Sequence, residues 1–190
     1  MDRREALRRT ALMIGGIVSA PTMLGIMNGC TAKPTINWKP VFLSPEQGIL
    51  ISELTEIIIP KTDTPGAKDV GVPGFIDVML KDVYEKKDQD EFLQGLIAFD
   101  EDAKNTLGDS FIDLDPEQRT EYVYTLHAKA LKDNAKERPF ILKVKELTVA
   151  GYFTSEAGAT QVLQYEPVPG AYHGCIPLSE AGNGKTWATS

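Results

Sequence analysis

The sequence predicts an all-α protein: a small bundle of about five helices, preceded by a signal peptide and followed by an extended tail rich in proline and glycine. Three observations support this prediction. Apolar residues recur at three- and four-residue steps through the middle of the chain, which is the spacing of one helix face. Several of these runs begin with a capping residue followed by a proline. The sequence shows no convincing pair of strands and no internal repeat.

Length and charge limit the class of protein. The chain has 190 residues, enough for one domain of about 150 residues and a targeting segment. Its 42% hydrophobic and 25% charged residues are typical of a globular protein. The net charge is −7, and residues 1–29 hold four arginines against two acidic residues, so the body that follows carries −9. An acidic body argues against binding nucleic acid through a basic face.

The first 29 residues predict an export signal. Positions 1–10 are basic, and positions 11–27 form an uncharged apolar run of 17 residues that glycines and a proline interrupt. A membrane-spanning helix needs about 20 predominantly apolar residues, so a signal peptide over residues 1–29 is the better interpretation. The protein is therefore expected to work outside the cytoplasm, in the periplasm.

The basic part of this segment resembles a twin-arginine export signal. The resemblance rests on an arginine pair, a leucine and a further arginine: Arg3, Arg4, Leu7 and Arg8. Ala6 departs from the pattern, because a bulky Phe is common there. The twin-arginine pathway exports proteins that are already folded. A general secretory signal that is rich in arginine is the alternative.

The end of the signal has three interpretations. Met27-Asn28-Gly29-Cys30 resembles a lipoprotein cleavage box, in which Cys30 becomes the lipidated first residue. Such an anchor would hold the protein at a membrane surface. Cleavage after Ala32 and an uncleaved anchor are the other two. Residues 30–43 then read as a tether.

A helical domain is predicted over residues 44–164. Ser44 is a good N-cap, Pro45 occupies the first helical position, and Gln47 completes a capping box. The apolar stripe of this helix consists of Leu50, Ile51, Leu54, Ile57 and Ile58. Pro60 ends it. Residues 60–71 then form a loop that is long for a compact domain, and long loops are often functional or mobile.

Four further helices follow by the same criteria. Pro73 opens the second helix, Asp88 or Asp90 caps the third, Asp115-Pro116 opens the fourth, and Arg138-Pro139 opens the fifth. Gly108 is expected to end the third helix in a left-handed conformation. The residues expected to face inward are Phe75, Ile76, Met79, Leu80 and Val83; Phe92, Leu93, Leu96, Ile97 and Leu107; Tyr122, Val123, Leu126 and Leu131; and Ile141, Leu142, Leu147 and Val149. A short helical piece is expected near residues 156–163, before the tail of residues 165–190.

No motif in the sequence supports catalysis, cofactor binding or a metal site. A dinucleotide-binding glycine motif after a strand is missing, and Gly184-Lys185-Thr186 lacks the glycine and the helix of a phosphate-binding loop. His127 is interpreted as a packing or surface residue. His173 beside Cys175 makes a poor metal site, because two ligands have no neighbours to complete the set. Asp109, Asp113 and Asp115 are turn and cap residues and do not match a calcium loop.

The tail holds a cysteine whose partner is in question. If Cys30 is lipidated or removed, Cys175 has no partner within the chain. In an oxidising compartment an unpaired thiol indicates an intermolecular bridge or a free reactive group. A buried thiol that packs as a small apolar residue is the plainer alternative. Tyr172, Cys175 and Ile176 are predicted to form a contact or a disulfide with another subunit.

The chain resembles the gluconate 2-dehydrogenase subunit 3 family. The resemblance rests on Leu54–Pro60, on Thr62–Ala67, on Val72-Pro73 leading into Phe75–Asp77, and on Gly151–Glu156 together with Tyr172–Leu178. It covers most of residues 44–178, and the twin-arginine signal is also typical of the family.

This resemblance implies a small, non-catalytic subunit without a cofactor of its own. In such complexes a large subunit of the glucose-methanol-choline oxidoreductase type holds FAD, and a multihaem cytochrome c often accepts the electrons. The small subunit supplies the export signal and is needed to mature the large one. Two rival interpretations remain: a lipid-anchored helical scaffold without a redox partner, and a free-standing periplasmic enzyme.

Overall fold

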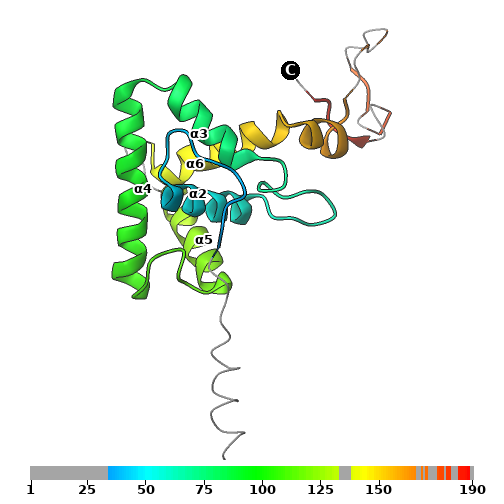
Figure 1. Cartoon of the computed structure of the whole chain (residues 1–190). Coiled ribbons are helices and arrows are strands. Elements are labelled where there is room, and N and C mark those ends of the chain that lie inside the picture. Colours follow the sequence, from blue (N-terminus) through cyan, green and yellow to red (C-terminus); the bar gives the residue numbers. More distant parts are fainter. Residues whose placement is uncertain are drawn as a thin grey trace, which may run out of the picture. The chain divides into compact units, whose positions relative to one another are not determined.

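A computed structural model describes residues 34–132 and 138–165 and, in the tail, residues 168, 170, 175–177, 179–180 and 184–188. The described chain forms α-helices and no strands, which confirms the all-α prediction (Figure 1). In chain order the elements are α2 (Pro45–Ile58), α3 (Val72–Asp82), α4 (Lys86–Leu107), α5 (Pro116–Lys132), α6 (Phe140–Phe153) and the π-helical turn η1 (Gly158–Val162). The predicted signal peptide and residues 30–33 of the predicted tether lie outside the described residues.

Helix α6 is the centre of the bundle. It packs against α2, α3, α4, α5 and η1, whereas α4 lies along one side (Figure 1). Val144 and Thr148 on α6 are completely buried, and Tyr152 nearly so. Thr148 can lie in the core because its hydroxyl donates to the Val144 carbonyl oxygen at 2.7 Å. A helix with so many neighbours needs apolar residues around much of its circumference, and α6 has them.

Two helix starts follow the predicted capping chemistry. At α2, the Gln47 N–H donates to Ser44 Oγ at 3.2 Å, and the Ser44 N–H donates to Gln47 Oε1 at 2.9 Å. Asp115 and Gln118 exchange the same pair of bonds at the start of α5, at 2.8 and 3.2 Å. Each exchange satisfies backbone donors that the first turn of a helix leaves free.

The start of α4 differs from the prediction. Neither Asp88 nor Asp90 is the cap: the helix begins at Lys86, after Glu85, whose side chain makes no capping bond. Asp88 lies in the first turn, where its charge suits the positive end of the helix dipole. Asp90 pairs with Lys86 one turn earlier, at 2.7 Å. The end of this helix was predicted correctly, because Gly108 has a left-handed φ of 93°.

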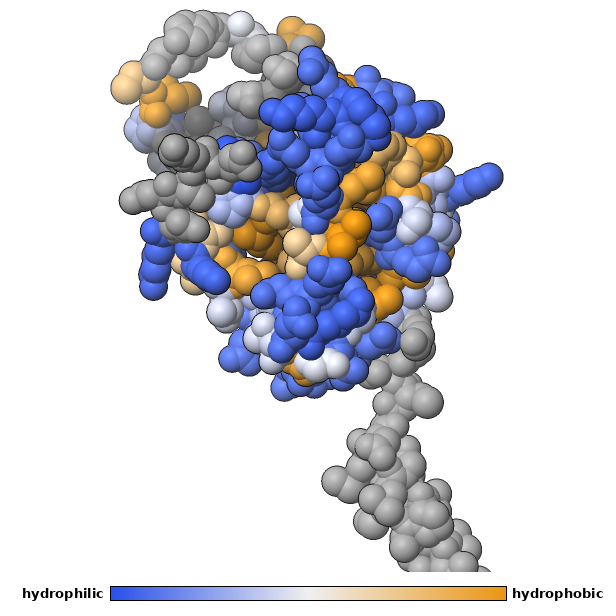
Figure 2. Space-filling view, turned by 90° about the vertical axis from the view of Figure 1, so that its left-hand side faces the viewer, coloured by the Kyte–Doolittle hydropathy of each residue, from blue (hydrophilic) through white to orange (hydrophobic). Residues whose placement is uncertain are grey.

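Several residues predicted to face inward are exposed. This prediction is wrong for Val83, Ile97, Leu107, Leu131 and Val149. Val83 is the C-cap of α3, and Leu107 and Leu131 occupy the last turns of their helices. Ile97 follows the buried Leu96, and one residue turns about 100° around a helix. Figure 2 shows the side on which α4 lies, with hydrophobic surface between hydrophilic clusters.

Aromatic rings join α4, α5 and α6 at the core. Phe99 is central: its ring centroid lies 4.9 Å from that of Phe111, 5.2 Å from that of Tyr122 and 5.9 Å from that of Phe140. The tilted and edge-on arrangements are those that aromatic quadrupoles favour. The Tyr122 hydroxyl lies 2.9 Å from the Phe99 carbonyl oxygen and 2.8 Å from Asp102 Oδ2, so the buried ring keeps its polar atom paired.

The described residues near the C-terminus form hydrogen bonds with Gln164, at the point where the tail begins. The Gln164 N–H donates to the Thr186 carbonyl oxygen at 2.8 Å, and the Ala188 N–H donates to the Gln164 carbonyl oxygen at 2.7 Å. These bonds form an isolated parallel bridge between Gln164 and Trp187. Lys185 Nζ adds a bond to the Gln161 carbonyl oxygen at 2.6 Å. The two ends of the tail are therefore held beside η1.

Candidate interaction surfaces

The predicted site residues are only partly described. Arg3, Arg4, Leu7, Arg8, Cys30 and Tyr172 lie outside the described residues. Cys175 is exposed and has no disulfide partner in the described chain, and Ile176 is exposed as well. Within the described residues, no group of three or more His, Cys, Asp or Glu side chains could hold a metal ion. No described helix is long and apolar enough to cross a membrane.

The tether is attached to the bundle by a buried carboxylate. Asp77 on α3 is 1% exposed and accepts hydrogen bonds from three consecutive backbone N–H groups. The distances are 2.6 Å from Val41, 3.1 Å from Phe42 and 2.7 Å from Leu43. Bonds to an ionised acceptor are stronger than neutral ones, and they compensate the desolvation of the carboxylate. Asp77 thus fixes the direction in which the chain enters α2.

Sequence reasoning missed Asp77, although a signal was present. Asp77 follows Pro73 by four residues and precedes Leu80 by three, so it belongs to the apolar stripe of α3. An acidic residue on a core-facing stripe requires a buried partner. Its partners are backbone groups of a segment more than 30 residues away, which the sequence pattern does not reveal.

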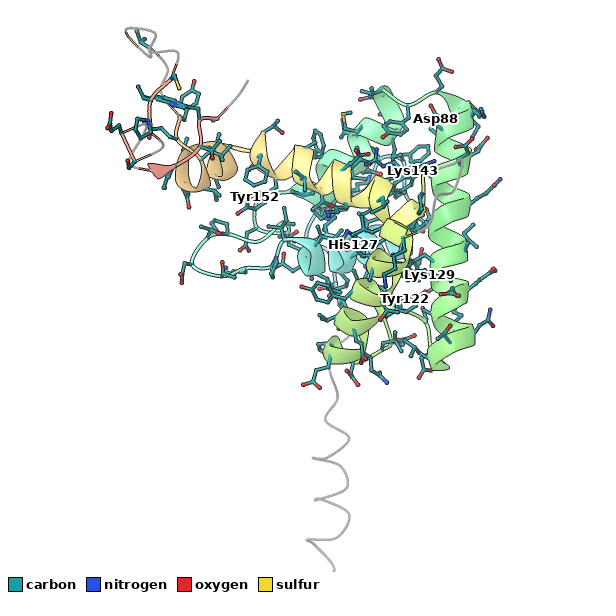
Figure 3. The ribbon with its side chains drawn as sticks, turned by 180° about the vertical axis from the view of Figure 1, so that it is seen from behind. Asp88, Tyr122, His127, Lys129, Lys143 and Tyr152 are labelled. Atoms are coloured by element: carbon teal, nitrogen blue, oxygen red, sulfur yellow. The ribbon has the colours of Figure 1, made fainter. Side chains whose placement is uncertain are left out.

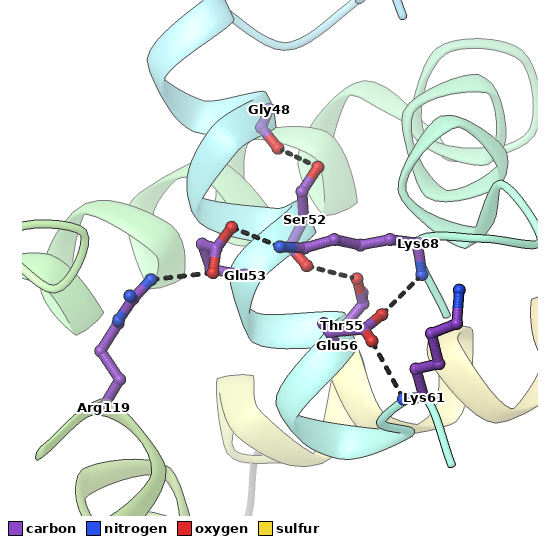
Figure 4. A network of polar contacts seen from close by, with 8 residues as sticks. All are labelled: Gly48, Ser52, Glu53, Thr55, Glu56, Lys61, Lys68 and Arg119. Carbon is purple, nitrogen blue, oxygen red and sulfur yellow. Dashed lines mark hydrogen bonds and ion pairs between the residues drawn. The ribbon is translucent and has the colours of Figure 1, made fainter. Parts of the chain in front are cut away.

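A charged network holds the loop of residues 60–71 against α2 (Figure 4). Glu56 accepts the backbone N–H of Lys61 at 3.0 Å and that of Lys68 at 2.9 Å. Glu53, one turn earlier, binds the Lys68 ammonium group and accepts from Arg119 Nη1 at 2.8 Å. Arg119 belongs to α5 and is largely buried, so this pair also joins α2 to α5.

The same loop forms one wall of a polar cleft. The cleft has a volume of about 770 Å³ and lies between the loop and the residues that follow α6. The Tyr152 hydroxyl donates to the Pro65 carbonyl oxygen at 2.7 Å and so fixes the loop to the end of α6. The polar residues that line the cleft include Lys61, Thr62, Asp63, Asp69, Glu156 and Gln161. Such a lining suits a hydrated polar contact rather than an apolar ligand.

A second groove, of about 310 Å³, lies between α4, α5 and the start of α6. Its floor contains Phe99 and Phe140, and its polar groups are Asp102, Tyr122 and Lys129. Burial raises the pKa of Tyr122, and the hydrogen bond to Asp102 raises it further, so this phenol remains protonated at neutral pH. Gly95 permits the close approach of the helices here, because a Cβ on it would lie 2.6 Å from the Phe140 ring.

A smaller apolar recess lies where the end of α2 meets α5 and α6. It has a volume of about 160 Å³ and is lined by Ile57, Ile58, Val123, Tyr124 and Ile141, together with His127 and Lys145. Lys145 Nζ lies 2.9 Å from His127 Nε2. Figure 3 shows this side of the molecule, with His127 labelled near the place where α5 and α6 meet. The prediction that His127 is a packing or surface residue did not anticipate this pairing.

The fold and these surfaces can be compared with known proteins. A family model, gluconate 2-dehydrogenase subunit 3, matches residues 45–170. The match begins at the first residue of α2, spans every described helix and ends in the tail. No curated protein and no solved structure gives a significant match. The matched region is about two thirds of the chain, and the protein therefore belongs to the gluconate 2-dehydrogenase subunit 3 family.

Proposed function

We propose that this protein is the non-catalytic small subunit of an exported, FAD-dependent dehydrogenase that oxidises a sugar or a sugar acid. Membership of the family carries the proposal, because the family name itself describes one subunit of a gluconate dehydrogenase complex. In this proposal the partner subunit, of the glucose-methanol-choline oxidoreductase type, holds the FAD and performs the oxidation. A cytochrome c subunit then accepts the electrons.

We further propose that the small subunit carries its partner across the membrane. The support is the Arg3-Arg4 pair with Leu7 and Arg8, which resembles a signal for export of folded proteins. A folded flavoprotein without a signal can cross only when it is bound to a subunit that has one. The complex would then work in the periplasm, and lipidation of Cys30 would hold it at the membrane surface.

The test is co-purification followed by export. A tag on this chain should retain a yellow flavoprotein from the periplasmic fraction. Changing both Arg3 and Arg4 to Lys should leave both chains in the cytoplasm, whereas Arg9→Lys, outside the Arg3–Arg8 pattern, should not. Normal export of the double variant in a strain without other routes would refute the twin-arginine assignment.

Two other outcomes would support the rival interpretations. A colourless protein purified without a flavoprotein would indicate a scaffold, and dehydrogenase activity of the isolated chain would indicate a free-standing enzyme.

Membrane anchoring through Cys30 is tested separately. If Cys30 is lipidated, Cys30→Ala should release the mature protein into the soluble periplasmic fraction, and mass spectrometry of the wild-type N-terminus should show the acylated cysteine.

A further inference from the structure

Lys145 is a partly buried cation without a carboxylate partner in the described chain. Three described lysines and arginines are buried or half-buried: Arg119, Lys143 and Lys145. Arg119 pairs with Glu53 at 2.8 Å, and Lys143 pairs with Glu91 at 3.3 Å. Among the described residues, the polar contact of Lys145 is the 2.9 Å bond to His127 Nε2. Within the part of the chain that the structure describes, the other two buried or half-buried cations are paired with carboxylates, and Lys145 is not.

The bond to His127 does not supply the missing negative charge. An ammonium group has no lone pair, so Lys145 donates and His127 Nε2 accepts. An imidazole that accepts this bond carries no negative charge. The surrounding recess is apolar, with Ile57, Ile58 and Ile141 in its wall. An ammonium group at the edge of an apolar recess is stabilised when an opposite charge approaches it.

Three exposed apolar side chains lie about one helical turn from this pair along α5 and α6. Tyr124 is 62% exposed, Leu131 is 64% exposed and Val149 is 38% exposed. Tyr124 precedes His127 by three residues, Leu131 follows it by four, and Val149 follows Lys145 by four. Residues at these steps share one side of a helix. We call Tyr124, His127, Leu131, Lys145 and Val149 the Lys145 face. Exposed apolar side chains on the same side as a charged group are typical of interaction sites.

The charge of this part of the chain is opposite to that of the whole. Residues 122–150 contain six lysines and arginines against three acidic residues, a net charge of +3, whereas the complete chain carries −7. The Lys145 face therefore belongs to a basic segment of an acidic protein. A partner surface that complements it must be acidic, with apolar groups beside the charge.

We propose that the Lys145 face is a docking surface for an acidic segment of the flavoprotein partner. An aspartate or glutamate of that segment binds the Lys145 ammonium group, and an apolar side chain next to it enters the recess beside Tyr124. This inference rests on the proposed function for the identity of the partner. It adds which surface of the small subunit is used and which chemistry recognises it.

The experiment compares retention of the co-expressed flavoprotein by tagged small-subunit variants, measured as flavin absorbance per small subunit after washing. Lys145→Glu reverses the charge, Lys145→Met removes it at similar length, and Tyr124→Ser alters only an exposed side chain. Lys81→Glu is the control, because Lys81 is exposed on α3. Truncating one member of a desolvated charge pair costs about 2 kcal/mol or more, so each Lys145 variant should lose about thirtyfold or more in retention.

Salt dependence separates the charge from the packing. Wild-type retention should fall as the salt concentration rises, and the Lys145→Met complex should be weaker but less sensitive to salt. Circular dichroism and thermal unfolding should be unchanged for Tyr124→Ser, so a loss of retention in that variant reflects the surface and not the fold. Retention equal to wild type in Lys145→Glu and Tyr124→Ser would overturn the inference.

A photo-crosslinking residue at position 124 identifies the occupant. The expected product joins this position to an acidic segment of the flavoprotein. A product with a second copy of this chain, or with its own tail, would overturn the inference.

The proposed function can fail separately: if the wild-type protein retains no flavoprotein, that proposal is wrong and this one falls with it. If the wild type and Lys145→Glu retain it equally, only the docking surface is wrong.

Discussion

The carboxylate of Asp77 on α3 accepts a hydrogen bond from the backbone N–H of Leu43 at 2.7 Å, across 34 residues of sequence. The same carboxylate also accepts from the two preceding N–H groups, so a single buried side chain satisfies three consecutive backbone donors. Leu43 is itself buried, and its position at the entrance to α2 depends on this contact.

Asp77→Asn should therefore destabilise the protein strongly. The amide has one acceptor oxygen, and its NH₂ group would face a backbone donor, so at least one of the three N–H groups would lose its partner. We expect the free energy of unfolding to fall by about 3 kcal/mol, measured by urea denaturation. Asp82→Asn, at the exposed end of the same helix, should change it by less than about 0.5 kcal/mol. Equal stability of the two variants would contradict this account of the tether.

Gly158→Ala should disturb the turn after α6. A Cβ on Gly158 would lie 2.0 Å from the Tyr152 carbonyl oxygen, which is backbone and cannot rotate away. The expected loss of stability is about 1 to 3 kcal/mol. Gly74→Ala is the matched control: on α3 a Cβ would meet only the Trp38 ring, at 3.9 Å. It should raise stability by up to about 1 kcal/mol because alanine favours helix. Thermal unfolding of both variants measures the difference.

The lowered pKa of Asp100 should make the free energy of unfolding depend on pH. Burial alone would raise its pKa, but hydrogen bonds from Lys104, from Ser110 and from the Phe111 N–H outweigh burial, so the pKa is lowered. A carboxyl group whose folded pKa lies below its unfolded value, about 3.9, stabilises the protein above that pH. The contribution is lost as the pH falls through the lowered folded value.

Asp100→Asn should then cost about 1 to 2 kcal/mol at pH 7, and the difference from wild type should shrink below about pH 4. Urea denaturation at both pH values measures it. Glu101→Gln is a suitable control at pH 7, because the neighbouring Glu101 is exposed. A difference between wild type and Asp100→Asn that stays constant at all pH values would exclude this role for Asp100.

Cys175 is predicted to bridge to the partner subunit after export. Its exposure in the isolated chain leaves the thiol accessible to a second protein in an oxidising compartment. Non-reducing gel electrophoresis of the complex should show one heavy band that splits on reduction. Cys175→Ser should abolish that band without changing helical content. Separate chains in the wild-type lane would refute the bridge, and assembly that survives removal of the tail after Gln164 would refute docking through the tail.

The helix starts could be predicted from the sequence because their chemistry is local. The reciprocal bonds of Ser44 with Gln47 involve residues three apart, and a pattern of that length can be read directly. The start of α4 was misplaced because Glu85 precedes the helix without a capping bond. The contacts that matter most for the surfaces are not local. Lys145 meets His127 across 18 residues, and only the packing of α6 on α5 brings them together.

The attachment of the tether at Asp77 also has a mechanical consequence. Tension that reaches residue 41 from the preceding chain is resisted by the three hydrogen bonds from Val41, Phe42 and Leu43 to one carboxylate. Because these bonds share one acceptor group, the load is transmitted to α3 as well as along the chain. Helix α2 begins only after this point, so it bears the full tension only when those bonds have broken.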